Sequence, residues 1–256
     1  MFELIILAVL QGVAEFLPIS SSGHLVIGQQ VLDIHEPGLR LNLCLHLGTL
    51  ISIFAFYWRV IWRIIRHFEW LYVVKIVLSA VPAVVVYVCF KDFIDGMFAN
   101  TRMVGALLMF TGAVLIGTRY LPRGNKDVSL LRALLMGLGQ ALALLPGVSR
   151  SGMTLASARG GGVNPEKSAE FSFLMSAPLI LGGMLLEVLK AVKEPAAASA
   201  DGFGWGALAF GAAVSAVVGY FSLALLVKAL KGKWFWLFGP YCLVAGLLTL
   251  VFARGA

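Results

Sequence analysis

Charge is what this sequence lacks most. Only 13% of its 256 residues are charged, 60% are hydrophobic, and the mean hydropathy is +0.91. An ordinary soluble domain carries about 25% charged residues, so this chain has too little polar surface to coat a water-soluble globule. Intrinsic disorder is excluded as well, because it requires low hydrophobicity. We therefore expect an integral membrane protein.

Cysteine is also scarce, since the chain has only Cys44, Cys89 and Cys242, each within an apolar run. This usage excludes a disulfide framework and a cysteine-based zinc site. The formal net charge of +7 does not indicate a nucleic-acid partner, because the basic residues are spread over short connections between apolar runs. That distribution is typical of membrane topology signals and of contacts to lipid phosphates.

A membrane-crossing helix needs about 20 apolar residues. Six runs of that length lie near 39–57, 72–90, 102–121, 169–190, 204–227 and 234–253. Two further regions, about 1–33 and 130–158, are apolar but are interrupted midway by Pro, Gly and Ser. Non-helical backbone at membrane depth is tolerated only when it is buried in protein or lines a wet cavity. Each interrupted region is therefore predicted to be two half-helices around a functional turn.

The two interrupted regions match each other. A shift of 129 positions superposes five identical pairs: Gln11 on Gln140, Ala14 on Ala143, Ser20 on Ser149, Ser22 on Ser151 and Gly23 on Gly152. This indicates an internal duplication within one membrane domain, 1–256, with repeat one at about 1–121 and repeat two at about 130–256. Each repeat contains one re-entrant hairpin and three crossings, and an odd number of crossings inverts the second repeat. The predicted fold is thus an all-α integral membrane protein with two inverted repeats.

Basic residues in the loops give an independent prediction of topology. Twelve Lys and Arg residues fall on one side, in 59–66, 119–132, 159–167 and 228–233, and six fall on the other side. The first side is therefore predicted to be cytoplasmic. The first hairpin then enters from the extracytoplasmic side and the second from the cytoplasm, so that their tips meet and build one site.

Ionisable side chains at membrane depth indicate function. Gln11 and Glu15 share one helix face, and the Glu15 carboxylate is a candidate metal ligand, general base or partner of His24. His24 follows a Ser-Gly turn and is a candidate nucleophile, acid or base, although a structural histidine is the alternative. Among other polar residues, His46 and Glu170 are candidates for the cavity lining.

Both tips contain serines: Ser20, Ser21 and Ser22 in the first, Ser149 and Ser151 in the second. Hydroxyls and free N–H groups at a helix start attract phosphate, although such serines also serve simply as N-caps. Arg150, between two of these serines, has a planar fork that suits bidentate phosphate binding, and a structural ion pair with Glu15 is the alternative. The residues alone thus indicate a membrane-embedded anion site for an amphiphile with a phosphate head.

Two short segments are expected to shape helices. Asn164-Pro165-Glu166 reads as a helix start, with Asn as the N-cap and Pro at the first helical position. Gly182-Gly183 is expected to permit close helix packing.

The stretches Gln11-Gly12-Val13-Ala14-Glu15-Phe16-Leu17-Pro18-Ile19-Ser20-Ser21-Ser22-Gly23-His24 and Pro146-Gly147-Val148-Ser149-Arg150-Ser151-Gly152 resemble the two signatures of the undecaprenyl-diphosphate phosphatase family, the bacitracin-resistance phosphatases. The resemblance spans essentially the whole chain. It implies hydrolysis of undecaprenyl diphosphate to the monophosphate carrier of cell-wall synthesis. It also implies a bacterial plasma-membrane protein whose site opens to the extracytoplasmic face. Bacitracin would compete by binding the substrate, and membrane lipids and a second copy of the chain in a homodimer are further expected partners.

By position, the resemblance makes Glu15, Ser21, His24 and Arg150 catalytic, with Ser21, His24 or water as the attacking group. The remaining polar residues of the tips are expected to bind substrate: Gln11, Ser20, Ser22, Ser149 and Ser151. The resemblance also implies Mg²⁺ or Ca²⁺, with Glu15 and Gln11 as ligands. Gln11 departs from the carboxylate found in part of the family, which leaves Glu15 as the motif's single acidic group.

Two other functions stay open at the level of the sequence. Inverted repeats with broken helices are also typical of transporters, so a transporter or flippase for a polyprenyl phosphate is the alternative. A lipid-binding membrane scaffold is a third, less specific one.

Overall fold

The computed structural model describes residues 1–31, 39–98, 100–193 and 203–252. Within these ranges, the regular structure is helical. Repeat one contains α1 (Phe2–Ala14), α2 (Ser21–Val31), α3 (Leu39–Phe56), α4 (Trp58–Arg66), α5 (Trp70–Phe98), α6 (Thr101–Gly117) and the short η1 (Thr118–Tyr120). Repeat two contains α7 (Leu130–Leu142), α8 (Arg150–Gly160), α9 (Pro165–Lys193), α11 (Trp205–Lys231), η2 (Phe235–Leu237) and α12 (Phe238–Phe252).

The expected membrane crossings are present. Five helical segments of the described chain are long and apolar enough to span a membrane: Trp70–Phe98, Thr101–Tyr120, Pro165–Leu186, Trp205–Lys231 and Phe235–Phe252. A sixth span is formed if α3 and α4 count together, although the chain bends by 67° between them. The prediction of a multi-crossing helical membrane protein is therefore confirmed, whereas α4, which buries no residue, was not anticipated.

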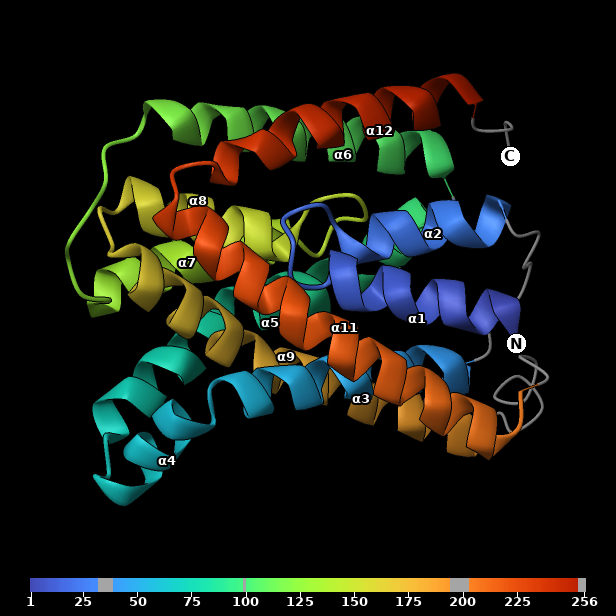
Figure 1. Cartoon of the computed structure of the whole chain (residues 1–256), viewed down its shortest axis with the longest axis horizontal. Coiled ribbons are helices and arrows are strands. Elements are labelled where there is room, and N and C mark those ends of the chain that lie inside the picture. Colours follow the sequence, from blue (N-terminus) through green and yellow to red (C-terminus); the bar gives the residue numbers. More distant parts are fainter. Residues whose placement is uncertain (32–38, 99, 194–202, 253–256) are drawn as a thin grey trace.

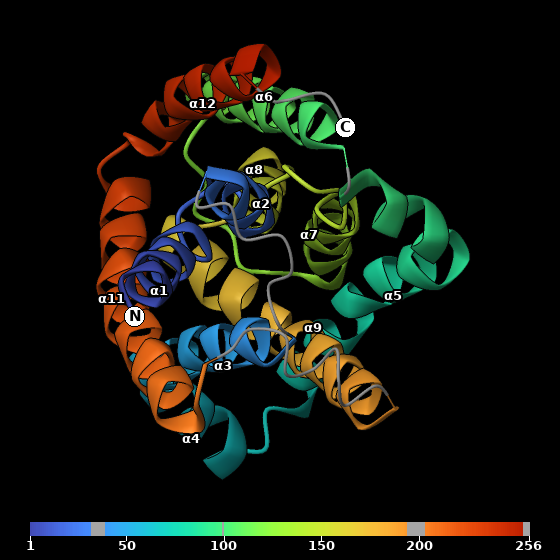
Figure 2. The same ribbon diagram turned by 90° about the vertical axis from the view of Figure 1, so that its right-hand side faces the viewer.

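The two interrupted regions are short helical hairpins, as expected. α1 and α7 each have 13 residues and reach only about 20 Å, which is too short to cross a bilayer. Figure 1 shows that the α1–α2 and α7–α8 hairpins enter the molecule from opposite ends. Viewed along the long axis, these hairpins lie inside a surround of the longer helices (Figure 2).

Packing between the repeats holds the hairpins in place. α1 packs against α11, and the corresponding helix α7 packs against α5. α6 and α12 pair closely, because a Cβ added to Gly112 would lie 2.7 Å from the Gly239 carbonyl oxygen, and one added to Gly246 would lie 2.6 Å from that of Gly105. Small residues allow this backbone approach between membrane helices.

The predicted start of α9 is confirmed. The Asn164 side chain accepts the N–H of Glu166 at 2.9 Å, and Pro165 occupies the first helical position, where its missing N–H costs nothing.

Candidate active site

The turns of the two hairpins meet inside the molecule. A Cβ built on Gly23 would lie 3.1 Å from the Cα of Gly147, and the Ser151 hydroxyl donates to the Leu17 carbonyl at 3.2 Å. Thr111 of α6 braces the second turn by donating its hydroxyl to the Gly147 carbonyl at 3.0 Å. The two serine-rich tips therefore converge, as the inverted-repeat prediction requires.

Each tip ends in a helix start that is capped by a serine. The Ser20 hydroxyl accepts the N–H of Gly23 at 3.3 Å, and the Ser149 hydroxyl accepts the N–H of Gly152 at 3.2 Å. The capping role that was the alternative for these serines is thus observed. Because one hydroxyl satisfies one N–H, other N–H groups of the first turn lack intrahelical acceptors and give each helix start a partial positive charge.

A cavity of about 280 Å³ lies at this meeting point. Its polar wall is formed by Glu15, Ser20, Ser21, Ser22, His46, Gln140, Arg150 and Ser176. Its apolar wall is formed by Ala143, Leu144, Val148, Leu179, Ile180, Gly183 and Met184. The cavity is therefore amphiphilic and is lined by residues from both hairpins, α3 and α9.

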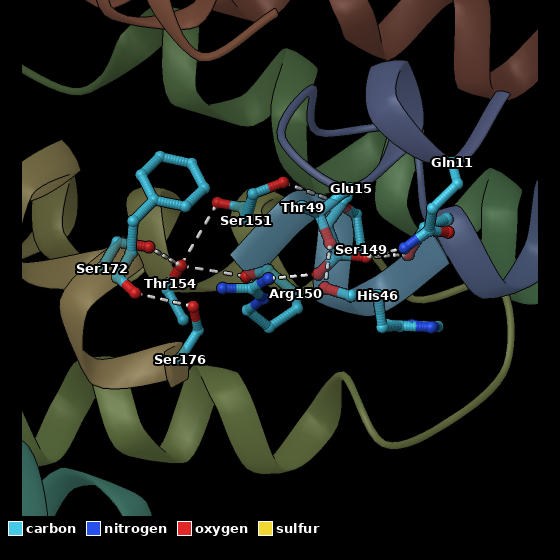
Figure 3. Close-up of polar contacts among 12 residues, drawn as sticks. Gln11, Glu15, His46, Thr49, Ser149, Arg150, Ser151, Thr154, Ser172 and Ser176 are labelled. Atoms are coloured by element: carbon cyan, nitrogen blue, oxygen red, sulfur yellow. Dashed lines mark hydrogen bonds and ion pairs between the residues drawn. The ribbon is translucent and has the colours of Figure 1, made fainter. Parts of the chain in front are cut away.

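Glu15 is the centre of the polar wall. One carboxylate oxygen pairs with Nη2 of Arg150 at 2.5 Å, and the other accepts the Ser21 hydroxyl at 2.7 Å and the Gln11 amide at 3.2 Å. The Glu15 and Arg150 side chains are only 7% and 17% exposed. Figure 3 shows Gln11, Glu15 and Arg150 in one row across the two repeats. The ion pair that was an alternative reading therefore exists, and it brings a candidate nucleophile to the same carboxylate.

The ion pair does not satisfy the whole of Arg150. Its Nη1 atom is buried and has no hydrogen-bond partner among the described residues. The guanidinium carbon lies 5.8 Å from the centre of the Phe173 ring, which packs 5.5 Å from Phe16. Both rings are fully buried, so one side of the guanidinium packs on the apolar core. Arg150 thus retains a free donor while one side of its guanidinium is shielded from water.

A row of hydroxyls continues from Arg150 along α8 and α9 (Figure 3). Thr154 donates to the Arg150 carbonyl at 2.9 Å and lies 2.6 Å from the Ser172 hydroxyl. Ser176, one turn further along α9, lines the cavity itself. The row fixes the backbone that carries Arg150, since each of these three side chains is buried.

His24 does not line the cavity. Its Nδ1 lies 3.0 Å from the Ser20 carbonyl oxygen and its Nε2 lies 2.7 Å from the Tyr241 hydroxyl. Because a carbonyl can only accept, Nδ1 carries the proton and Nε2 accepts from Tyr241. Both ring nitrogens are therefore engaged in holding the first turn against α12, and the catalytic role of His24 stays a prediction.

His46, in contrast, lines the cavity, as proposed for it. Its Nδ1 lies 2.9 Å from the Asn42 carbonyl oxygen and donates to it.

Two sequence-based expectations are wrong. Glu170 is absent from the cavity lining; it pairs with Arg63 at 3.3 Å and accepts the Tyr72 hydroxyl at 3.2 Å. Gly182 and Gly183 do not permit close helix packing, because a Cβ at either position would have nothing within 4 Å. Gly183 instead lies on the apolar wall of the cavity.

Two cavity residues were missed. Gln140 and Ser176 are 2% and 1% exposed and both line the cavity. The signal for Gln140 was available, because it is the counterpart of Gln11 in the second repeat. Ser176 lies in the long α9 helix, where nothing in the local sequence distinguishes it from a packing residue.

A divalent cation such as Mg²⁺ or Ca²⁺ needs several oxygen ligands. Across 1–31, 39–98, 100–193 and 203–252, no three His, Cys, Asp or Glu side chains cluster. Among the described residues, Glu15 is the only carboxylate of the cavity wall, and Gln11, which contacts Glu15 from outside the lining, has a buried, unpartnered Oε1. Mg²⁺ is commonly held by one or two carboxylates together with substrate phosphates and waters. These residues fit such a substrate-assisted cation but not an all-protein cage.

Fold and site together define a multi-crossing helical membrane protein whose two re-entrant hairpins join a buried arginine, a carboxylate and serines in one amphiphilic cavity. A sequence model described as bacitracin resistance protein BacA matches residues 4–248, and the chain belongs to this family.

Curated relatives over nearly the full length carry the name undecaprenyl-diphosphatase. The protein from Parabacteroides distasonis is 39% identical and that from Methanosphaera stadtmanae 36% identical, with 97% and 96% of each chain covered. The one from Halothermothrix orenii is 33% identical, with 98% of each chain covered. The family resemblance of the two motifs is therefore confirmed.

Proposed function

We propose that this protein hydrolyses undecaprenyl diphosphate to undecaprenyl phosphate and inorganic phosphate. The observation that carries the proposal is Arg150, a buried guanidinium with one unpartnered nitrogen in a cavity between two helix starts. A buried donor without a partner is costly, and a phosphate oxygen in the cavity would satisfy it. The name shared by the relatives supplies the substrate class.

The shape of the cavity supports a lipid substrate. Its polar wall suits a diphosphate head group, whereas Leu179, Ile180 and Met184 suit the first units of a hydrocarbon tail. Gly183 adds no side chain to this apolar wall, which leaves room for a tail to pass beside α9. A soluble diphosphate would leave this wall without a function.

Ser21 is the attacking group that the geometry favours. Its hydroxyl already donates to Glu15 at 2.7 Å, which is the arrangement of an activated nucleophile. The Ser21 oxygen attacks the terminal phosphorus, its proton passes to Glu15, and the bond between this phosphorus and the bridging oxygen breaks. The lipid monophosphate leaves, and water then hydrolyses the phosphoserine to release inorganic phosphate and restore the serine.

Charge stabilisation falls to Arg150 and to the helix starts of both hairpins. Arg150 and the N–H groups at the starts of α2 and α8 neutralise negative charge on the transferred phosphoryl group. Mg²⁺ or Ca²⁺, held by Glu15, the Gln11 amide oxygen and the substrate, would supply further positive charge to the diphosphate. The buried Phe173 ring beside the guanidinium lowers the local dielectric and strengthens the attraction of Arg150 for the head group.

We place the protein in the bacterial plasma membrane with its cavity opening on the extracytoplasmic side. The distribution of basic loops supports this orientation, and the apolar wall uses residues from the midpoint of α9 onward, toward the membrane side that carries six rather than twelve basic residues. A substrate exposed there would also be accessible to bacitracin, whose binding to the lipid would compete with the enzyme.

The test is phosphate release by the full-length protein in detergent from a polyprenyl diphosphate. We expect release by the wild type with Mg²⁺ or Ca²⁺ and its loss after chelation. Binding of the lipid without release under both cations would overturn the hydrolase and favour a polyprenyl-phosphate transporter. Full activity after chelation would overturn only the role of the cation.

A further inference from the structure

Gln140 is a buried amide without a function in the fold. It lies near the end of α7, is 2% exposed and lines the cavity. Neither its Nε2 nor its Oε1 has a hydrogen-bond partner among the described residues. Because both atoms are unpartnered, the usual ambiguity between amide nitrogen and oxygen does not affect this conclusion. Buried polar groups without partners are rare in folded proteins and call for a cause.

The first repeat shows what is unusual about this amide. Gln11, the counterpart of Gln140, donates to Glu15 at 3.2 Å. The residue that corresponds to Glu15 in the second repeat is Leu144, which offers no acceptor. Gln140 thus occupies a position whose internal partner is missing, while facing the same cavity.

A second residue of the cavity wall has an unpartnered donor. Nη1 of Arg150 is buried and free, so two residues that line the cavity carry a nitrogen with no acceptor among the described residues. A ligand with several acceptor oxygens would satisfy both, and a diphosphate head group is such a ligand.

We propose that Gln140 binds the diphosphate head group of the substrate, with Nε2 donating to a phosphate oxygen beside Arg150 and Oε1 accepting from a water in the cavity. This assignment rests on the proposed function and adds a substrate-binding residue to it. It explains why an amide persists where the fold gives it no partner.

The test uses Gln140→Met, which keeps the side-chain length and removes both hydrogen-bonding atoms. The probe is a non-hydrolysable polyprenyl diphosphate with a methylene bridge, and the matched probe is the polyprenol without phosphates. We expect affinity for the bisphosphonate to fall about tenfold or more, as for a lost hydrogen bond to a charged group, and affinity for the polyprenol to stay unchanged. KM for the diphosphate lipid should rise accordingly.

Thermal unfolding of the ligand-free protein separates binding from structure. Since no internal hydrogen bond is lost, Gln140→Met should unfold at the wild-type temperature or above it. The control is Ser222→Ala, which removes a buried hydroxyl of α11 that bonds only within its own helix and lies outside the cavity lining. This control should leave both affinities unchanged.

Gln140→Glu provides a second variant of the same shape. Its carboxylate should repel the diphosphate and weaken bisphosphonate binding more than the methionine does. If both variants fold and keep bisphosphonate affinity and KM within about twofold of wild type, Gln140 does not bind the head group. That result would leave the proposed hydrolase function unaffected. Wild-type protein that neither binds nor hydrolyses the lipid would instead overturn the proposed function.

Discussion

The two re-entrant turns share a frame but carry different chemical groups. Ser20 and Ser149 cap their helices in the same way. The next residue is Ser21 in the first turn and Arg150 in the second, and Glu15 corresponds to Leu144. Two identical tips would bring like charges together at the meeting point, which electrostatic repulsion disfavours. The two turns thus share a similar frame, and the site depends on the side chains in which they differ.

The backbones of the turns differ as well. In the first turn, Ser20 itself adopts the left-handed conformation with a φ of 70°. In the second turn, Gly147 adopts it with a φ of 96°, and Ser149 has an ordinary φ of −75°. Glycine fits this conformation without strain, whereas serine does not. The first turn therefore stores strain at a residue that lines the cavity.

The largest effect is expected where the two turns are joined by charge. Arg150→Ala should lower kcat/KM for the diphosphate lipid by more than about a thousandfold, because the phosphoryl group loses its cationic anchor. It should also destabilise the protein by up to about 3 kcal/mol, since Glu15 is left buried without its partner. Phosphate release and thermal unfolding measure the two effects.

A double variant separates these effects. Glu15→Gln with Arg150→Met removes both charges, so stability should recover while activity stays lost. If Arg150→Ala alone keeps a tenth of the wild-type activity, the positive charge of Arg150 in the second turn is not essential for the reaction.

Ser21→Ala separates the nucleophilic role of the first turn from the phosphate-binding role of Arg150 in the second turn. We expect activity to fall about a thousandfold or more while lipid binding is retained, because Arg150 and the helix starts remain. Acid quench during turnover of a substrate labelled in its terminal phosphate should trap label on Ser21 of the wild type. Rapid turnover by Ser21→Ala, or label on a histidine, would contradict serine attack.

Much of this arrangement was predictable from local patterns. The apolar runs and their interruption by Pro, Gly and Ser predicted the helices, because helix formation and membrane depth depend on nearby residues. The match between the segments that contain Gln11 and Gln140 predicted that the two tips meet. The contact of His24 with Tyr241 joins residues far apart in the chain, and no local pattern records it. The open space beside Gly183 likewise depends on the tertiary packing of distant helices, which the local sequence does not record.

The apolar wall offers a second contrast between the repeats, since it carries Leu144 where the first turn has Glu15. The Cβ of Gly183→Trp would meet no atom within 4 Å and its indole would extend into the open wall, so we expect the fold to be retained. We expect kcat/KM to fall about tenfold for a long polyprenyl diphosphate and less for a short one, because the tail loses its apolar contact surface. An equal loss of kcat/KM for both chain lengths, measured by phosphate release, would show that the tail does not contact this wall.

His24→Asn tests whether His24 acts as a general acid or base or only holds the first turn by hydrogen bonds. Asparagine can still donate to the Ser20 carbonyl, so we expect activity within about tenfold of wild type, the loss of roughly one hydrogen bond. Tyr241→Phe should have a smaller effect, because it removes only the outer contact. A folded His24→Asn protein that is inactive at every pH would establish His24 as catalytic.

The smallest effect should come from exchanging the two capping serines for glycine. Ser20→Gly relieves the left-handed serine and loses only a few tenths of a kcal/mol of capping, so stability should hold or rise by up to about 1 kcal/mol. Ser149→Gly relieves nothing and adds backbone entropy to the unfolded chain, so stability should fall by about 0.5–1 kcal/mol. Unfolding of both variants in the same detergent measures the difference. Equal destabilisation would mean that the first turn is not strained, and the asymmetry between the turns would then lie in their side chains alone.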